Sequence, residues 1–179
     1  MTNPYFSTID CWRIPEGAIP RSLEEMAQDG ESGNEGIVLF LGHHQQLTAE
    51  ITHLIGLRGP GIQKFPNLIN IYPPLLNDVT DLALELKVRL IGQVHSHAPE
   101  CGVDLSRTDR TYGIRAPYFL SLVAPDYALS HASIDSWGIH VFMEAKGYVR
   151  LSREGVNRRI KVVPGATIPF ITVGDHHGS

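Results

Sequence analysis

An unbroken apolar run near the start of the chain limits the fold more than any other feature. The segment Gly36–Leu41 contains no polar side chain. A strand with one face in water would alternate apolar and polar residues, whereas an unbroken run is typical of a strand that is covered on both faces. We therefore expect Gly36–Leu41 to lie inside a sheet with other elements packed on each side.

Capping residues and apolar spacing predict two helices in the first half of the chain. Ser22 is followed three residues later by Glu25, a capping-box pattern that predicts a helix start at Ser22. Asn77 or Asp78 can cap a second helix, which we expect to run to about Arg89.

Several other segments have the length and composition of strands. They are Thr8–Ile14, Gln45–Leu57, Leu68–Tyr72, Leu90–His97, Tyr118–Ala124, and a hairpin of Gly138–Met143 with Tyr148–Ser152. The segment Arg58–Pro66 is rich in Gly and Pro and is expected to be a loop. Because strands and helices are mixed along the chain, we expect an α/β or α+β fold in which a single mixed sheet is flanked by helices.

Size and composition favour one domain with a real core. The chain has 179 residues, of which 42% are hydrophobic. We expect a single domain over residues 1–179, with a mobile tail after about residue 165, where Gly and Pro interrupt the pattern.

Charge and cysteine content bear on partners and compartment. The net charge of −4 gives no reason to expect nucleic-acid binding. The first residues lack a basic segment followed by an apolar run, and no stretch is apolar for long enough to cross a bilayer. With two cysteines, Cys11 and Cys101, a disulfide framework is not expected. We therefore expect a soluble, cytoplasmic protein with no nucleic-acid or membrane partner.

A His-x-His pattern ends one of the expected strands. His95 and His97 are two residues apart, so on a strand their side chains point to the same face and can reach one metal ion. Catalytic zinc sites use three protein ligands and leave a position for water. A third ligand is therefore expected from the next element.

The segment that starts at Ser106 fits that requirement. If Ser106 opens a short helix, Asp109 lies one turn into it, close to Ser106 in space. Asp109 is then the expected third ligand. Ser106 could donate a hydrogen bond to an oxygen that develops negative charge.

Each of these patterns also has an ordinary structural interpretation. Among nine histidines a His-x-His pair can arise by chance, and Ser-x-x-Asp is a common helix cap. Cys101 lies close enough in sequence to be an alternative ligand, although a small buried residue is the ordinary interpretation. The remaining histidines are expected to be structural or solvated, including a pair in the tail; they are His43, His44, His53, His131, His140, His176 and His177.

Glu35 stands directly before the apolar run. A carboxylate that enters a buried strand needs a reason, because burial disfavours its charged form. One interpretation is a loop carboxylate that only precedes the strand. The functional interpretation is a general base beside a metal-bound water.

The order of these elements resembles the JAMM motif of the JAB/MPN-domain metallopeptidases. In that motif a Glu on an early strand is followed by a helix, a strand with His-x-His, and Ser-x-x-Asp, which correspond here to Glu35, His95, His97, Ser106 and Asp109. The resemblance covers roughly residues 34–152. The family usually has Pro directly after the second His and seven residues before the Ser; this chain has one extra residue, so that Pro99 follows Ala98.

The resemblance implies a fold and a reaction. The fold would be the JAB/MPN-like, cytidine-deaminase-like sandwich. The reaction would be zinc-dependent hydrolysis of a peptide or isopeptide bond, with zinc on His95, His97 and Asp109, Glu35 as the acid/base, and Ser106 stabilising the oxyanion. The implied substrate is ubiquitin or a ubiquitin-like protein, attached to a conjugate or processed at its C-terminus, and activating-like and conjugating-like enzymes are the implied partners.

Two other functions fit parts of the pattern. A metal-dependent phosphoesterase can also use His-x-His, but such enzymes are barrels that need about 250 residues. A non-catalytic MPN-type scaffold would have the same fold, but such scaffolds generally lack the ligands that this chain has.

Overall fold

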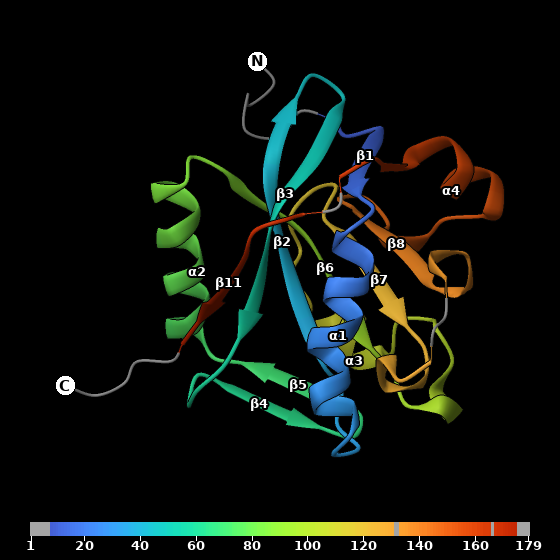
Figure 1. The fold of residues 1–179 in the computed structure, drawn as a ribbon. Coiled ribbons are helices and arrows are strands. Elements are labelled where there is room, and N and C mark those ends of the chain that lie inside the picture. Colours follow the sequence, from blue (N-terminus) through green and yellow to red (C-terminus); the bar gives the residue numbers. More distant parts are fainter. Residues whose placement is uncertain (1–7, 131–132, 166, 175–179) are drawn as a thin grey trace.

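The apolar run becomes strand β2 (Ile37–Gln45), which lies in the middle of a large mixed sheet (Figure 1). The structure is a computed structural model that describes residues 8–130, 133–165 and 167–174. β2 pairs antiparallel with β3 (Thr48–Leu57) on one side and with β6 (Arg89–Ser96) on the other. Its residues are buried from Ile37 to Gly42, as expected for a strand covered on both faces.

The sheet extends in both directions from this centre. Its strand order is β10-β1-β3-β2-β6-β7-β8-β9, and β11 pairs with the second half of β3. The pairs β6–β7, β1–β10, β1–β3 and β3–β11 are parallel and the others are antiparallel. The remaining strands of this sheet are β1 (Cys11–Pro15), β7 (Leu120–Ala124), β8 (Gly138–Met143), β9 (Gly147–Arg150), β10 (Ile160–Val163) and β11 (Phe170–Val173).

Two helices cover opposite faces of the central strands. Helix α1 (Ala18–Gly30) packs on the face that presents Val38, and helix α2 (Pro73–Glu85) packs on the face that presents Leu39. In Figure 1, α1 and α2 lie on either side of β2 and β3. The expected α+β fold with a mixed sheet flanked by helices is therefore confirmed.

The expectation of a single sheet is wrong. Strands β4 (Ile62–Phe65) and β5 (Leu68–Ile71) form a separate two-stranded hairpin below the main sheet in Figure 1. β4 lies inside the segment that was expected to be a loop, because the Gly and Pro residues before it suggested no strand. The expected strand over Gln45–Leu57 begins later than predicted. Gln45 ends β2, a turn follows in which Gln46 has a positive φ of 52°, and β3 begins at Thr48.

Both long helices begin earlier than predicted. α1 begins at Ala18, so Ser22 lies inside the helix with its side chain buried, and the capping box expected there is wrong. α2 begins at Pro73 rather than at Asn77 or Asp78. Proline fits the first helical turn because its φ is already helical and its missing N–H is not needed there.

The last part of the chain is more ordered than expected. A mobile tail was expected after about residue 165, but Phe170–Val173 forms β11 in parallel register with residues 54–57 of β3. Helix α4 (Arg153–Arg159) and β10 were not predicted. His131, His176 and His177 lie outside the described residues.

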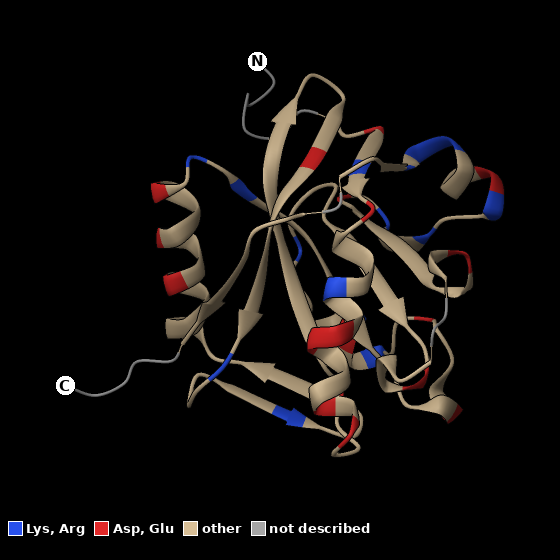
Figure 2. Ribbon diagram, viewed as in Figure 1, with Lys and Arg blue, Asp and Glu red and all other residues tan. Residues whose placement is uncertain are grey.

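Charged residues gather on two helices far from each other. Figure 2 shows acidic residues along α2 and basic residues on α4. One of the basic residues of α4, Arg159, holds the helix to the rest of the protein. It donates to the backbone oxygens of Ile9 and Asp10 and lies over the Trp12 ring. Among the described residues, no helix combines the length and apolar character that a membrane crossing requires.

Candidate metal centre

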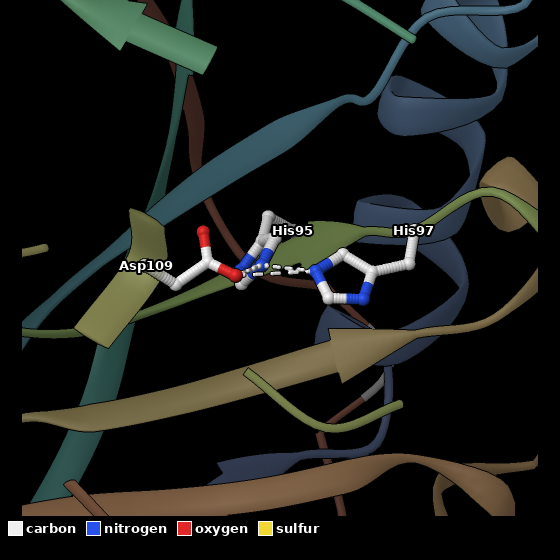
Figure 3. A group of neighbouring side chains, drawn as sticks. All are labelled: His95, His97 and Asp109. Carbon is white, nitrogen blue, oxygen red and sulfur yellow. Dashed lines mark hydrogen bonds and ion pairs between the residues drawn. The ribbon is translucent and has the colours of Figure 1, made fainter. Parts of the chain in front are cut away.

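The two histidines of the His-x-His pattern lie at the end of β6 and are both buried (Figure 3). His95 pairs with Ile37 of β2 and with Val123 of β7, so neighbouring strands flank it on both sides. His97 follows the strand, and its backbone N–H donates to the oxygen of Ala124 at 2.9 Å. The two Nε2 atoms lie 3.1 Å apart, so the imidazoles converge as their spacing predicted.

Asp109 reaches the same point from the other side. It lies in the short helix α3 (Arg107–Tyr112), and its Oδ2 is 3.3 Å from Nε2 of His97 and 3.6 Å from Nε2 of His95. Ser106 caps this helix: its Oγ accepts from the N–H of Asp109 at 3.1 Å, and its own N–H donates to Asp109 Oδ2 at 2.8 Å. The helix-cap and ligand interpretations are therefore compatible, because one carboxylate serves both.

The orientation of the His97 ring is set by a backbone carbonyl. Nδ1 of His97 lies 3.1 Å from the oxygen of Gly102. Since a carbonyl can only accept, Nδ1 carries a proton, and in the neutral ring the lone pair of Nε2 faces His95 and Asp109; when Nε2 is protonated it donates to Asp109 instead. Gly102 has a φ of +66°, a conformation that favours glycine. Nδ1 of His95 is buried and has no hydrogen-bond partner among the described residues.

The neighbouring charges shift the pKa values of Asp109 and His97 in opposite directions. Burial alone would raise the pKa of Asp109, but the neighbouring imidazoles of His95 and His97 outweigh burial and hold this pKa well below its usual range. Burial would lower the pKa of His97, but its hydrogen bond to Asp109 and the charge of Glu35 raise it. Without a cation, the cluster therefore holds an anionic Asp109 carboxylate beside a His97 imidazole whose pKa is raised.

Glu35 lies beside this cluster and is itself buried, with 5% of its surface exposed. Its backbone N–H donates to the oxygen of Phe65 at 2.9 Å, so the residue is anchored where β2 begins and the β4–β5 hairpin turns. Burial raises the pKa of Glu35 to about 7; the charge of His97 opposes this shift and that of Asp109 adds to it. A carboxyl with this pKa can both accept and release a proton near neutral pH.

Ser96, which the sequence analysis did not single out, joins the two parts of the site. It is fully buried between the two histidines, and its Oγ accepts from the N–H of Gly36 at 2.9 Å. Its N–H donates to the oxygen of Gly36 at 2.9 Å. These two bonds hold the residue after Glu35 against the His-x-His segment. The pattern of a serine flanked by two candidate ligands was the only sequence signal for this role.

A second set of contacts, also missed, holds α3 in place. Asp104 accepts from Nε2 of the fully buried His140 at 3.1 Å, and Arg150 and Arg110 lie 3.3 and 3.8 Å from its carboxylate. Arg110, next to Asp109 in α3, also donates to the oxygen of Tyr148 at 2.9 Å. We call Asp104, His140, Arg110 and Arg150 the α3 clamp. It connects the helix that carries Asp109 to β8 and β9.

A groove runs along α3 to the candidate site. Glu35, His95 and Asp109 line one part of it, and apolar side chains line much of the rest. The hairpin contributes Leu68, Ile69 and Ile71, and α3 contributes Thr108 and Tyr112. A concave site with mostly apolar walls and a few polar groups is typical of ligand-binding sites.

The other candidate residues lie outside the cluster. Cys101 is exposed and is not one of the three grouped ligands, and both it and Cys11 are free thiols. His140 belongs to the α3 clamp, as its ordinary structural interpretation implied. Within the described residues, His43, His44 and His53 are not part of a three-ligand group.

The chemistry of the grouped donors fits a divalent metal ion. The ligand atoms of His95, His97 and Asp109 all lie within 4.8 Å of one another. Two imidazole nitrogens and one carboxylate oxygen are donors that zinc and other first-row metals accept, and three protein ligands leave room for water. The three residues could therefore hold a metal.

Comparisons with known proteins establish the fold but not the family. No protein-family model matches the chain, and no curated protein sequence matches it. Among solved structures, the solution structure of protein DSY2949 from Desulfitobacterium hafniense is similar, with a TM-score of 0.64 and 14% sequence identity. The match covers 93% of this chain and 97% of that one. At this identity the likeness shows a shared fold alone.

Proposed function

We propose that this chain is a zinc-dependent peptidase or isopeptidase of the JAB/MPN type, which cleaves a ubiquitin-like protein from a conjugate or processes its C-terminus. One observation carries the proposal: a buried carboxyl, Glu35, whose pKa is raised to about 7, stands beside three converging metal-ligand side chains. Perturbed acids next to a metal-ligand set are typical of hydrolytic sites. The order of these residues in the sequence, which resembles the JAMM motif, supports the same class.

The residues of the chain would divide the chemistry between them. Zinc on His95, His97 and Asp109 would lower the pKa of a water molecule and polarise the scissile carbonyl. Glu35 would accept the proton of the attacking water on its carboxylate and deliver it to the leaving amine. Its pKa near 7 suits both transfers.

Ser106 is the proposed donor to the developing oxyanion. Its Oγ already accepts from the N–H of Asp109, so the hydroxyl proton remains available for donation. The side chain is exposed beside the groove, where a substrate carbonyl could reach it.

The groove is the reason for favouring an extended polypeptide as substrate. Its largely apolar walls suit a chain of small or apolar residues, and Glu35, His95 and Asp109 line it. The proposed partners are therefore a ubiquitin-like protein and the activating-like and conjugating-like enzymes that would attach it. The phosphoesterase alternative needs a parallel barrel, whereas this sheet is mixed and ends at β10 and β9, so no observation favours it.

The decisive experiment compares Glu35→Gln with the unchanged protein. Zinc content should stay at about one ion per chain, while turnover of a ubiquitin-like protein joined through its C-terminus to a lysine side chain should fall about a hundred- to ten-thousand-fold. Gln cannot accept the proton but is nearly the same size. Glu31→Gln, which changes an exposed carboxyl at the end of α1, is the control and should keep full activity.

Two results would count against the proposal. Loss of zinc from Glu35→Gln would make Glu35 a ligand instead of the acid/base. Near-normal cleavage by Glu35→Gln would remove Glu35 from the mechanism, and a zinc-free, inactive unchanged protein would instead favour a scaffold.

A further inference from the structure

The segment directly after β7 has an unusual backbone. Asp126, Tyr127 and Ala128 all have positive φ angles, of 55°, 53° and 62°. Positive φ is uncommon for residues other than glycine, and three in a row persist only where surrounding contacts enforce them. The left-handed turn, residues 126–128, is therefore held by its neighbours.

The contacts of Tyr127 show which neighbours hold it. Its backbone N–H donates to the oxygen of His97 at 2.8 Å, and its hydroxyl donates to the oxygen of Pro66 at 3.0 Å. Its own carbonyl packs against the end of α1 so closely that a Cβ at Gly30 would lie 2.3 Å from the oxygen. One residue thus contacts a candidate metal ligand, the tip of the β4–β5 hairpin and helix α1.

The hairpin contact matters because the hairpin forms a wall of the groove. Pro66 lies in the turn between β4 and β5, next to Phe65, whose oxygen accepts from the N–H of Glu35. The following residues, Leu68, Ile69 and Ile71, line the groove that leads to Glu35 and His95. A shift of this turn would change the width of the groove.

A separate ion pair holds the hairpin to α1 but does not reach the site. Nζ of Lys64 lies 2.7 Å from Oδ2 of Asp29. Tyr127, in contrast, connects the hairpin to the site: its hydroxyl bonds to Pro66 and its backbone N–H bonds to His97.

We infer that Tyr127 is a positioning residue that fixes the β4–β5 wall of the groove relative to the metal-ligand segment. Its role as a determinant of substrate binding rests on the proposed function, whereas the mechanical link between hairpin and site does not. The residue acts through the position of the hairpin, so its loss should weaken substrate binding and leave the chemical step unchanged.

The test uses two matched hydroxyl deletions in the full chain. Tyr127→Phe removes the bond to Pro66, while Tyr72→Phe removes a bond of 2.8 Å to Gln63 at the other end of the hairpin. For Tyr127→Phe, amide hydrogen exchange of Glu35 and of residues 62–71 should accelerate about two- to ten-fold, as expected for one lost hydrogen bond. Tyr72→Phe should not change exchange at Glu35, and zinc content should be the same in both variants.

Activity provides the second measurement. With a ubiquitin-like protein–lysine isopeptide as substrate, Tyr127→Phe should raise KM about two- to ten-fold and leave kcat unchanged. Equal exchange at Glu35 in the two variants, or a lower kcat with unchanged KM, would overturn the inference. If the unchanged protein cleaves no such substrate, the proposed function fails, while the exchange comparison still decides whether Tyr127 links the hairpin to the site.

Discussion

The two halves of the candidate metal centre are held by different forces. His95 lies in β6, a central strand, His97 directly follows that strand, and each has 3% of its side chain exposed. Asp109 comes from a six-residue helix with no buried residue, and 25% of its side chain is exposed. Main-chain pairing on both sides positions the histidines, whereas a few side-chain contacts position the carboxylate.

This difference indicates where the site is easiest to disturb. Pairing along a sheet involves many hydrogen bonds, so no single side chain decides where His95 lies. The position of Asp109 depends on the Ser106 cap and the α3 clamp. Substitutions that remove one side chain far from the ligands should therefore affect the helix half and spare the strand half.

Removal of the strand half should have the largest effect. His95→Ala with His97→Ala eliminates two of the three proposed ligands and should abolish zinc binding, whereas Asp109→Ala should weaken it and leave a detectable two-histidine site. Metal analysis after dialysis measures both variants, and His176 and His177 should first be deleted so that they do not bind metal. Retention of zinc by the double variant would refute this site.

Disruption of the α3 clamp should weaken metal binding without touching a ligand. Asp104→Ala removes the carboxylate that His140, Arg110 and Arg150 share. Zinc affinity should fall about ten- to a hundred-fold, as it does when groups that support metal ligands are removed. A competing chelator measures the affinity. Asp10→Ala is the matched control, because Asp10 is 63% exposed and Asp104 is 61% exposed, and Asp10 pairs with Arg159 away from the site. Equal affinities in both variants would show that α3 does not need the clamp.

Glu35 and Asp109 should also respond oppositely to pH in the metal-free protein. The pKa of Glu35 is raised to about 7, so the folded state binds a proton that the unfolded state releases, and this stabilisation is lost as pH rises from about 5 to 8. The pKa of Asp109 is lowered, so its contribution is present at neutral pH and is lost as pH falls below its ordinary range.

Urea unfolding at several pH values measures these contributions. Glu35→Gln should remove a decline of about 2 kcal/mol between pH 5 and 8 that the unchanged protein shows. Asp109→Asn should leave most of that decline in place, because burial is its main cause and the charge of Asp109 adds only a smaller part, and it should flatten the loss of stability at acidic pH. An identical pH profile for Glu35→Gln and the unchanged protein would contradict the raised pKa.

The smallest effect is expected at the Ser106 cap. Ser106→Ala should cost about 1 kcal/mol of stability, as should Ser152→Ala, which removes the corresponding cap of α4. Only Ser106→Ala should also lower zinc affinity, by a few-fold, because only that cap orients a ligand. Thermal unfolding and a chelator titration separate the two effects. Equal zinc affinity in the two variants would mean that the cap stabilises α3 without orienting Asp109.

Local sequence patterns were sufficient for the elements that carry the site. The apolar run predicted β2 and its two covered faces, and Ser106-x-x-Asp109 predicted the cap of α3. Both patterns are reliable because the first reports burial of both faces of a strand and the second reports contacts one helical turn apart. The spacing of His95 and His97 predicted that the imidazoles converge, because residues two apart on a strand point to the same face.

Only the tertiary structure revealed the groups that hold the ligands in place. Ser96 and Gly36 are 60 residues apart, and His140 and Asp104 are 36 apart, so neither contact follows from local periodicity. The β4–β5 hairpin and the pairing of β11 with β3 likewise depend on which segments meet. Sequence by itself determined which residues could serve as ligands and as acid/base, because those depend on residue type and short spacing. The tertiary structure decided how they are oriented and supported, because those contacts form between segments that only the folded sheet brings together.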